Sequence, residues 1–129
     1  MDKYLLECHF DKYLKKLIKK LKNKTVIIYG TGSMFQYIIK NYNLSSLNII
    51  GICDGKYLDS DEGNLDLGYK IIPKNKLENY EPDYVILGVQ NYINLLFEFS
   101  GETFKHKKTK VLPLVRLPLI KILRKIWCE

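Results

Sequence analysis

The 129-residue sequence contains no alanine, only two arginines and only three cysteines. Cys8, Cys53 and Cys128 are odd in number and lie far apart, which excludes a disulfide framework and a C-x-x-C zinc site. The sequence also has no signal-peptide layout at its amino terminus and no run of about 18 apolar residues that would cross a bilayer. We therefore expect a cytoplasmic protein that is soluble or at most peripheral to a membrane.

The formal net charge is +7, yet 19 of the 21 basic residues are lysine. Arginine forms bidentate hydrogen bonds to phosphates and bases. Because arginine is scarce here, we expect no nucleic-acid partner. Residues 1–24 carry eight lysines and three acidic residues, and residues 105–129 carry eight basic residues and one acidic residue. The segment between them, 25–104, carries five lysines and ten acidic residues. Basic ends around an acidic centre fit three alternatives: terminal helices that dock on the core, a homo-oligomer, or contact with an anionic membrane surface.

The length predicts one domain over residues 1–129. Apolar residues at three- and four-residue steps predict an amphipathic helix within residues 1–24, with Leu6 and Phe10 on its apolar face. A basic helix is expected at 116–129, with Pro118 in its first turn. Between them, residues 25–115 alternate apolar runs with helical patterns. Strands are expected at 25–29, 47–53, 70–72, 83–89 and 109–114, and helices at 34–42 and 92–99.

This alternation predicts an α/β fold, namely a Rossmann-like, doubly wound, mainly parallel sheet of about five strands in the order 3-2-1-4-5. Residues 55–69 are polar and acidic, and we expect them to form a mobile loop. The spacing in this loop fits neither a phosphate-binding loop for ATP nor a calcium loop. No metal site is predicted.

The first predicted strand turns into a helix through two glycines. Gly30 permits a tight turn, and Gly32 lets the backbone approach a phosphate without an intervening Cβ. The amides that follow would open the helix and point at the anion. The predicted phosphate-binding residues are therefore Gly30, Thr31, Gly32, Ser33 and Met34.

Asp54 lies 22 residues after Gly32, at the end of the second predicted strand. From that position a carboxylate accepts hydrogen bonds from ribose hydroxyls. The dinucleotide pattern G-x-G-x-x-G is incomplete, because Phe35 occupies the place of the third glycine. This departure weakens the case for a dehydrogenase. The alternative is that the two glycines form only a tight strand-to-helix turn.

The runs VIIYGTGSMFQYIIKN, LNIIGICDGKY and YKIIPKNKLENYEPDYVILGV resemble the small Rossmann-like domains of bacterial surface-sugar biosynthesis. Such domains occur in sugar-amine acetyltransferases, in membrane-bound sugar epimerases and dehydratases, and in sugar C-methyltransferases. The resemblance covers residues 25 to about 92. It implies that the glycine turn and Asp54 hold a nucleotide-sugar, and that Gln90 and Asn91 form a third contact region. The repeats that carry acetyl transfer are absent from this sequence.

No catalytic constellation is visible. His9 and His106 lie in the flanks, and Cys53 is better explained as a small buried residue than as a nucleophile. We therefore predict an accessory domain whose ligand is NAD(P) or a nucleotide-sugar. Its predicted site also includes Gly55, Gly88, Gln90 and Asn91. One alternative is a sugar-nucleotide oxidoreductase or methyltransferase completed by oligomerisation, and another is an interaction module with a vestigial site.

Overall fold

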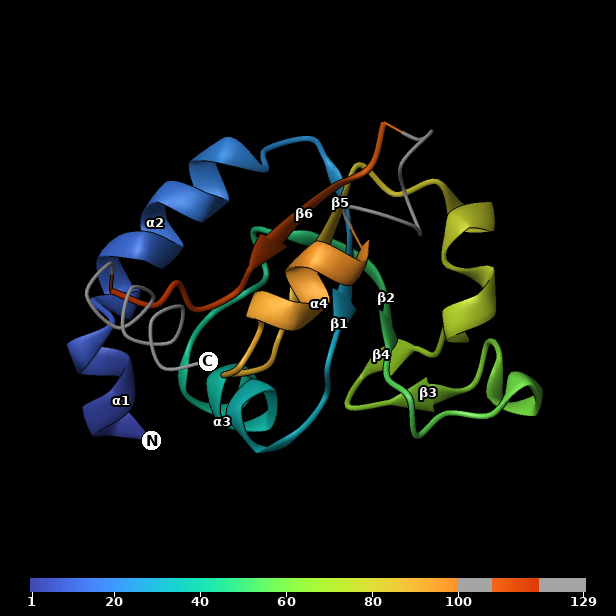
Figure 1. The fold of residues 1–129 in the computed structure, drawn as a ribbon, viewed down its shortest axis with the longest axis horizontal. Coiled ribbons are helices and arrows are strands. Elements are labelled where there is room, and N and C mark those ends of the chain that lie inside the picture. Colours follow the sequence, from blue (N-terminus) through green and yellow to red (C-terminus); the bar gives the residue numbers. More distant parts are fainter. Residues whose placement is uncertain (100–107, 119–129) are drawn as a thin grey trace.

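The computed structural model describes residues 1–99 and 108–118. At its centre is a four-stranded sheet, in the order β2-β1-β5-β6, in which all neighbouring strands run parallel (Figure 1). The predicted α/β fold is confirmed. The strands are β1 Thr25–Tyr29, β2 Asn48–Cys53, β5 Tyr84–Leu87 and β6 Lys110–Pro113.

The predicted third strand is present only in part. Ile71 forms a single parallel bridge with Ile52 on the outer side of β2, and the Ile72 amide donates to the Ile52 carbonyl at 2.8 Å. The predicted order therefore holds, but this member is one bridge long. The preceding residues form a short antiparallel hairpin of β3 (Leu65–Asp66) and β4 (Tyr69–Lys70), which lies, except for Lys70, in the segment that we expected to be a mobile loop.

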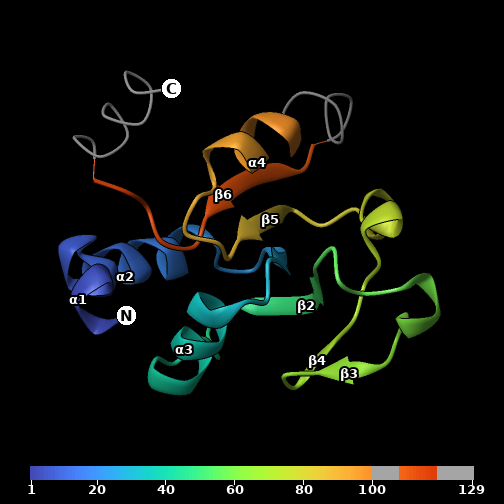
Figure 2. The same cartoon turned by 60° about the horizontal axis from the view of Figure 1, so that its bottom comes forward.

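Side chains of the central strands alternate between two apolar layers. Val26 and Ile28 of β1 face one layer, whereas Ile27 and Tyr29 face the other. Strands that are buried on both faces explain the continuous apolar runs of the sequence. Helix α3 (Ser33–Asn41) packs in the first layer, and α4 (Ile93–Glu98) lies on the opposite face of the sheet (Figure 2). Short 3₁₀ turns occur at Asp59–Asp61, Lys74–Lys76 and Glu78–Tyr80.

The amino-terminal segment forms two helices, α1 (Asp2–Glu7) and α2 (Phe10–Lys20), where we predicted one. His9 separates them with a left-handed backbone, at φ 53° and ψ 45°. The helix breaks because of the angular positions that the apolar residues would have around one helix axis. On one continuous helix, Leu5 and Phe10 would point about 140° apart, yet both are buried in the same layer. The break brings both onto the core and leaves Leu6, expected on the apolar face, 69% exposed.

Both amino-terminal helices dock on the sheet and share its first apolar layer. Residues 116–118, the start of the predicted carboxyl-terminal helix, are not helical, and its remainder, 119–129, lies outside the described residues. In the described part of the chain, no helix has the length and apolar composition needed to cross a membrane.

The left-handed backbone of His9 predicts opposite effects for two substitutions. His9→Gly should raise the free energy of unfolding by about 1 kcal/mol, because glycine adopts this conformation without the Cβ clash. His9→Ala should bring no gain. Urea unfolding followed by far-UV circular dichroism measures both. If residues 2–20 formed one continuous helix, alanine would be the more stable variant by about 1 kcal/mol.

Candidate functional site at the glycine turn

The glycine turn leaves the carboxyl end of β1 and packs backbone against backbone on the end of β5. Gly30 has φ 104°, a conformation that favours glycine. A Cβ on Gly30 would lie 2.5 Å from Val89 Cγ1, and a Cβ on Gly88 would lie 2.6 Å from the Gly30 carbonyl oxygen. Both glycines are therefore required for this approach. The contact lies between β1 and β5, where the chain order of the sheet changes direction, and ligands of such sheets bind outside the carboxyl ends of the strands at this point.

Phe35, which stands in place of the third glycine, is completely buried in the layer beneath the turn. Its ring centroid lies 6.5 Å from that of Tyr69 in the hairpin. A Cβ on Gly88 would lie 3.5 Å from Phe35 Cβ. This is an ordinary packing distance, so the first turn of α3 lies next to the end of β5.

Thr31 is the buried polar residue at the centre of the turn, with no exposed surface. Its amide and its hydroxyl both donate to Asp54 Oδ2, at 2.8 and 3.1 Å, and its carbonyl accepts from Gln36 Nε2 at 2.9 Å. Unpaired buried polar groups are costly, so this set of partners holds the turn in one conformation. The Thr31 amide, which we predicted to bind phosphate, is engaged by Asp54.

Asp54 connects the end of β2 to the turn and also accepts from the Lys56 amide through Oδ1, at 3.1 Å. Burial of the carboxyl opposes its ionisation, but the hydrogen bonds from the Thr31 and Lys56 amides and the Thr31 hydroxyl, with the Lys56 charge, outweigh burial and lower the Asp54 pKa. A carboxylate offers about four acceptor positions. Three are in use, so one remains for a ligand.

The first turn of α3 is the open part of the site. Gly32 and Ser33 are exposed, and Gly32 precedes the helix with φ −78°. A Cβ on Gly32 would meet no atom within 4 Å, and none of the described side chains caps the helix. The first amides of a helix have no partner within it. Because the Thr31 amide is engaged, the free donors here are those of Ser33 and Met34, although the Met34 side chain itself is buried.

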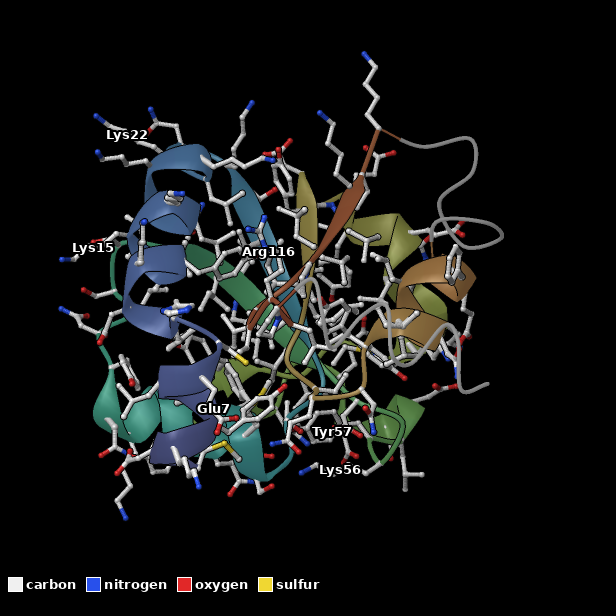
Figure 3. The ribbon with its side chains drawn as sticks, turned by 60° about the vertical axis from the view of Figure 1, so that its left-hand side comes forward. Glu7, Lys15, Lys22, Lys56, Tyr57 and Arg116 are labelled. Atoms are coloured by element: carbon white, nitrogen blue, oxygen red, sulfur yellow. The ribbon has the colours of Figure 1, made fainter. Side chains whose placement is uncertain are left out.

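Tyr57 and Asp66 belong to this site, although the sequence did not reveal them. Tyr57 Oη donates to Asp66 Oδ2 at 2.6 Å and lies 3.4 Å from Thr31 Oγ1. Burial and the hydrogen bond to Asp66 raise the Tyr57 pKa to about 12. Figure 3 shows Tyr57 beside Lys56, whose Nζ lies 5.4 Å from the centroid of the Tyr57 ring. The Tyr57 phenol thus connects the β3–β4 hairpin to the glycine turn.

The remaining predicted residues differ in their relation to the turn. Gly55 follows Asp54 and is exposed. Gln90 and Asn91 are exposed in the loop between β5 and α4, and Gln90 Nε2 contacts Met1 Sδ at 3.9 Å. Cys53 is fully buried, and burial together with the Asp54 charge raises its pKa to about 12.

The glycine turn, the acid after β2 and the parallel sheet define an α/β domain with a nucleotide-binding-like fold. A family model described as "C2185-like, N-terminal" matches residues 22–97, more than half of the chain. The chain belongs to this family. The matched segment runs from just before β1 into α4 and includes the turn, Asp54 and the loop after β5. A comparison with curated proteins found no match.

Among solved structures, the chain is similar to one described as "Crystal structure of RSP in complex with beta-NAD+ and operator DNA", with a TM-score of 0.48 and 18% sequence identity. The alignment covers 91% of this chain and 62% of that one, so the chain spans less than two thirds of its length. Neither comparison identifies the surface-sugar family that the sequence resembles.

The same finding corrects our expectation that nucleic acid is not a partner, since that protein was solved with operator DNA. The expectation rested on the scarcity of arginine. Lysine also neutralises backbone phosphates, and this attraction is largely independent of sequence, so a low arginine content does not exclude nucleic acid.

The hydrogen bonds of Asp54 predict that Asp54→Asn lowers the free energy of unfolding by about 1 to 2 kcal/mol at neutral pH, since two donors of buried Thr31 lose a charged acceptor at a partly exposed position. Because folding lowers the Asp54 pKa, this stabilisation is present above its ordinary value of 3.8 and is lost as the pH falls through the lower value of the folded state. Urea unfolding at pH 7 and below pH 3.8 measures both effects. A stability difference that did not shrink in acid would contradict the assignment.

Proposed function

We propose that this chain is a nucleotide-binding domain and that its ligand, NAD(H) or a nucleotide-sugar, lies over the glycine turn at the carboxyl edge of the sheet. The observation that carries the proposal is the turn itself. Buried Thr31 and ionised Asp54 hold it in place, and it presents an open, uncapped helix start at Gly32.

The phosphates would lie against the amides of Ser33 and Met34, where the helix dipole favours an anion. Gly32 leaves room there because the position a Cβ would take is empty. The ribose would use the one acceptor position that Asp54 retains. The loop containing Gln90 would contact the base or the sugar. The resemblance to surface-sugar biosynthesis domains supports a nucleotide-sugar in this role.

A binding role is favoured over catalysis by the titratable groups around the turn. A general acid or base works best with a pKa near the working pH. The Tyr57 phenol and the Cys53 thiol both have their pKa raised to about 12, and the Asp54 carboxylate is engaged in three hydrogen bonds. These groups are suited to holding the turn and a ligand rather than to moving protons.

Gly32→Ala tests the proposal, because its backbone conformation is accessible to alanine while the added methyl occupies the space intended for phosphate. We expect a stability loss below about 1 kcal/mol and at least a tenfold (about 1.4 kcal/mol) weaker affinity. Isothermal titration calorimetry with NAD⁺, NADP⁺ and a UDP-sugar measures the affinity. The proposal fails if wild-type protein binds none of them, or if Gly32→Ala binds as wild type does.

Two controls separate ligand contact from stability. Gly63→Ala places alanine at φ 83° on an exposed glycine outside the site, so it costs stability and should leave the affinity unchanged. Asp83 Oδ2 accepts from the Thr25 amide at 2.8 Å and its hydroxyl at 3.2 Å, the same arrangement as Asp54 and Thr31 but at the amino edge of the sheet. Asp83→Asn should therefore bind nucleotide as wild type does, whereas Asp54→Asn should bind more weakly.

A further inference from the structure

A second concave surface lies away from the glycine turn, between α2 and the segment that follows β6. It contains a cavity of about 630 Å³ that Lys12, Tyr13 and Lys16 line from α2, and Arg116, Leu117 and Pro118 from the other side. A smaller cavity of about 220 Å³ adjoins it and shares Tyr13, Lys16 and Arg116. We call the two together the basic cavity. All of these residues lie outside the segment that the family model matches.

The charge of the basic cavity has one sign. Lys12, Lys16 and Lys20 follow one another at four-residue steps on one side of α2, and Arg116 faces them across the cavity. No carboxylate of the described chain lines it, and none of these four cations forms a salt bridge with a described residue. Like charges four residues apart on a helix are destabilising. Stability therefore does not account for this arrangement, whereas attraction of an anion does.

Three contacts between residues far apart in sequence hold the walls of the basic cavity in place. Tyr13 Oη donates to the Pro113 carbonyl at 2.7 Å, which fixes α2 to the end of β6. The Arg116 guanidinium lies over the Tyr13 ring, 5.6 Å from its centroid. The Leu117 amide donates to Tyr92 Oη at 3.1 Å, which fixes the segment after β6 to the core. The lysine row and Arg116 are thereby held on the same cavity before any ligand arrives.

The lysines of α2 divide into two sets. Lys15 projects outward, away from Arg116, as does Lys22 just beyond the end of the helix (Figure 3). Neither of them nor Lys19 lines the cavity. A nucleic-acid backbone lying along α2 would contact the outward set as well. A ligand inside the cavity would contact only the inward set, so the two sets separate these binding modes.

We propose that the basic cavity binds a small di- or triphosphorylated metabolite, with its phosphates between Lys12, Lys16 and Arg116 and its organic part against Tyr13 and Leu117. The volume is that of a small-molecule site. Lysine and arginine supply phosphate contacts, and arginine adds a bidentate geometry. The half-buried Tyr13 ring and the buried Leu117 supply the apolar surface.

Calorimetric titration of the full chain with inorganic triphosphate and with ATP, at about 0.15 M salt to screen distant charges, tests this site. Lys12→Gln/Lys16→Gln and Arg116→Gln should each weaken binding at least about tenfold, since each removes charged hydrogen bonds. The matched control is Lys15→Gln/Lys19→Gln, which has the same charge change, spacing and helix and should change the affinity less than about twofold. ATP should bind more tightly than triphosphate because its organic part contacts the apolar wall.

The proposal is overturned if wild-type protein does not bind triphosphate, or if both double variants weaken binding equally. It is also overturned if a DNA duplex binds and depends on Lys15 and Lys19 as much as on Lys12 and Lys16, because the phosphates would then lie along the outside of α2. Gly32→Ala should leave triphosphate binding intact. That result distinguishes failure of this site from failure of the nucleotide site at the glycine turn.

Discussion

The carboxylate of Asp54 is the contact on which the candidate nucleotide site depends. It accepts both donors of Thr31, a residue with no exposed surface, and so attaches the turn after β1 to the end of β2. Without this acceptor two polar groups would be buried unpaired, and the turn would have to open to reach water. The direction of the turn sets the direction in which α3 begins. The Asp54 carboxylate thus sets the direction of the free amides of Ser33 and Met34. It can do so without contacting the phosphate itself.

The close packing of Gly30 against Gly88 is the second constraint, because a Cβ on either residue would collide with the other segment. A third glycine normally lets the helix approach the strand. Here Phe35 stands in its place and is completely buried in the layer beneath the turn. A motif read along the chain cannot show the approach of the two glycines, because Gly88 lies more than fifty residues from Gly30.

The sequence predicted the parts of the fold that have a strong period or a long apolar run. Strands β1 and β5, which we expected at 25–29 and 83–89, are buried on both faces, and their order in the sheet followed from the alternation with helices. It did not predict the break at His9, because the phase of Leu5 relative to Phe10 matters only when both must reach one core. The hairpin at 65–70 was also missed, since strands of two residues carry no period. In the site, Thr31 and Asp54 were both identified as ligand contacts. The spacing of these residues in the sequence indicates that they share one site. It does not show that Thr31 donates its hydrogen bonds to Asp54 rather than to a ligand.

The basic and acidic segments of the chain occupy different places in the folded structure. The two basic flanks are separated by the 80 residues of the acidic middle. Tyr13 and Pro113, 100 residues apart, are nevertheless hydrogen-bonded and bring Lys16 and Arg116 to one cavity. The acidic middle supplies Asp54 and Asp66, which surround the glycine turn. An anion at the turn would meet the backbone dipoles of an exposed helix start, whose direction is fixed by buried contacts and whose attraction salt also screens. An anion in the basic cavity would meet several exposed side-chain charges, which salt screens as well. The two surfaces therefore attract anions through different groups, backbone amides in one and side-chain cations in the other.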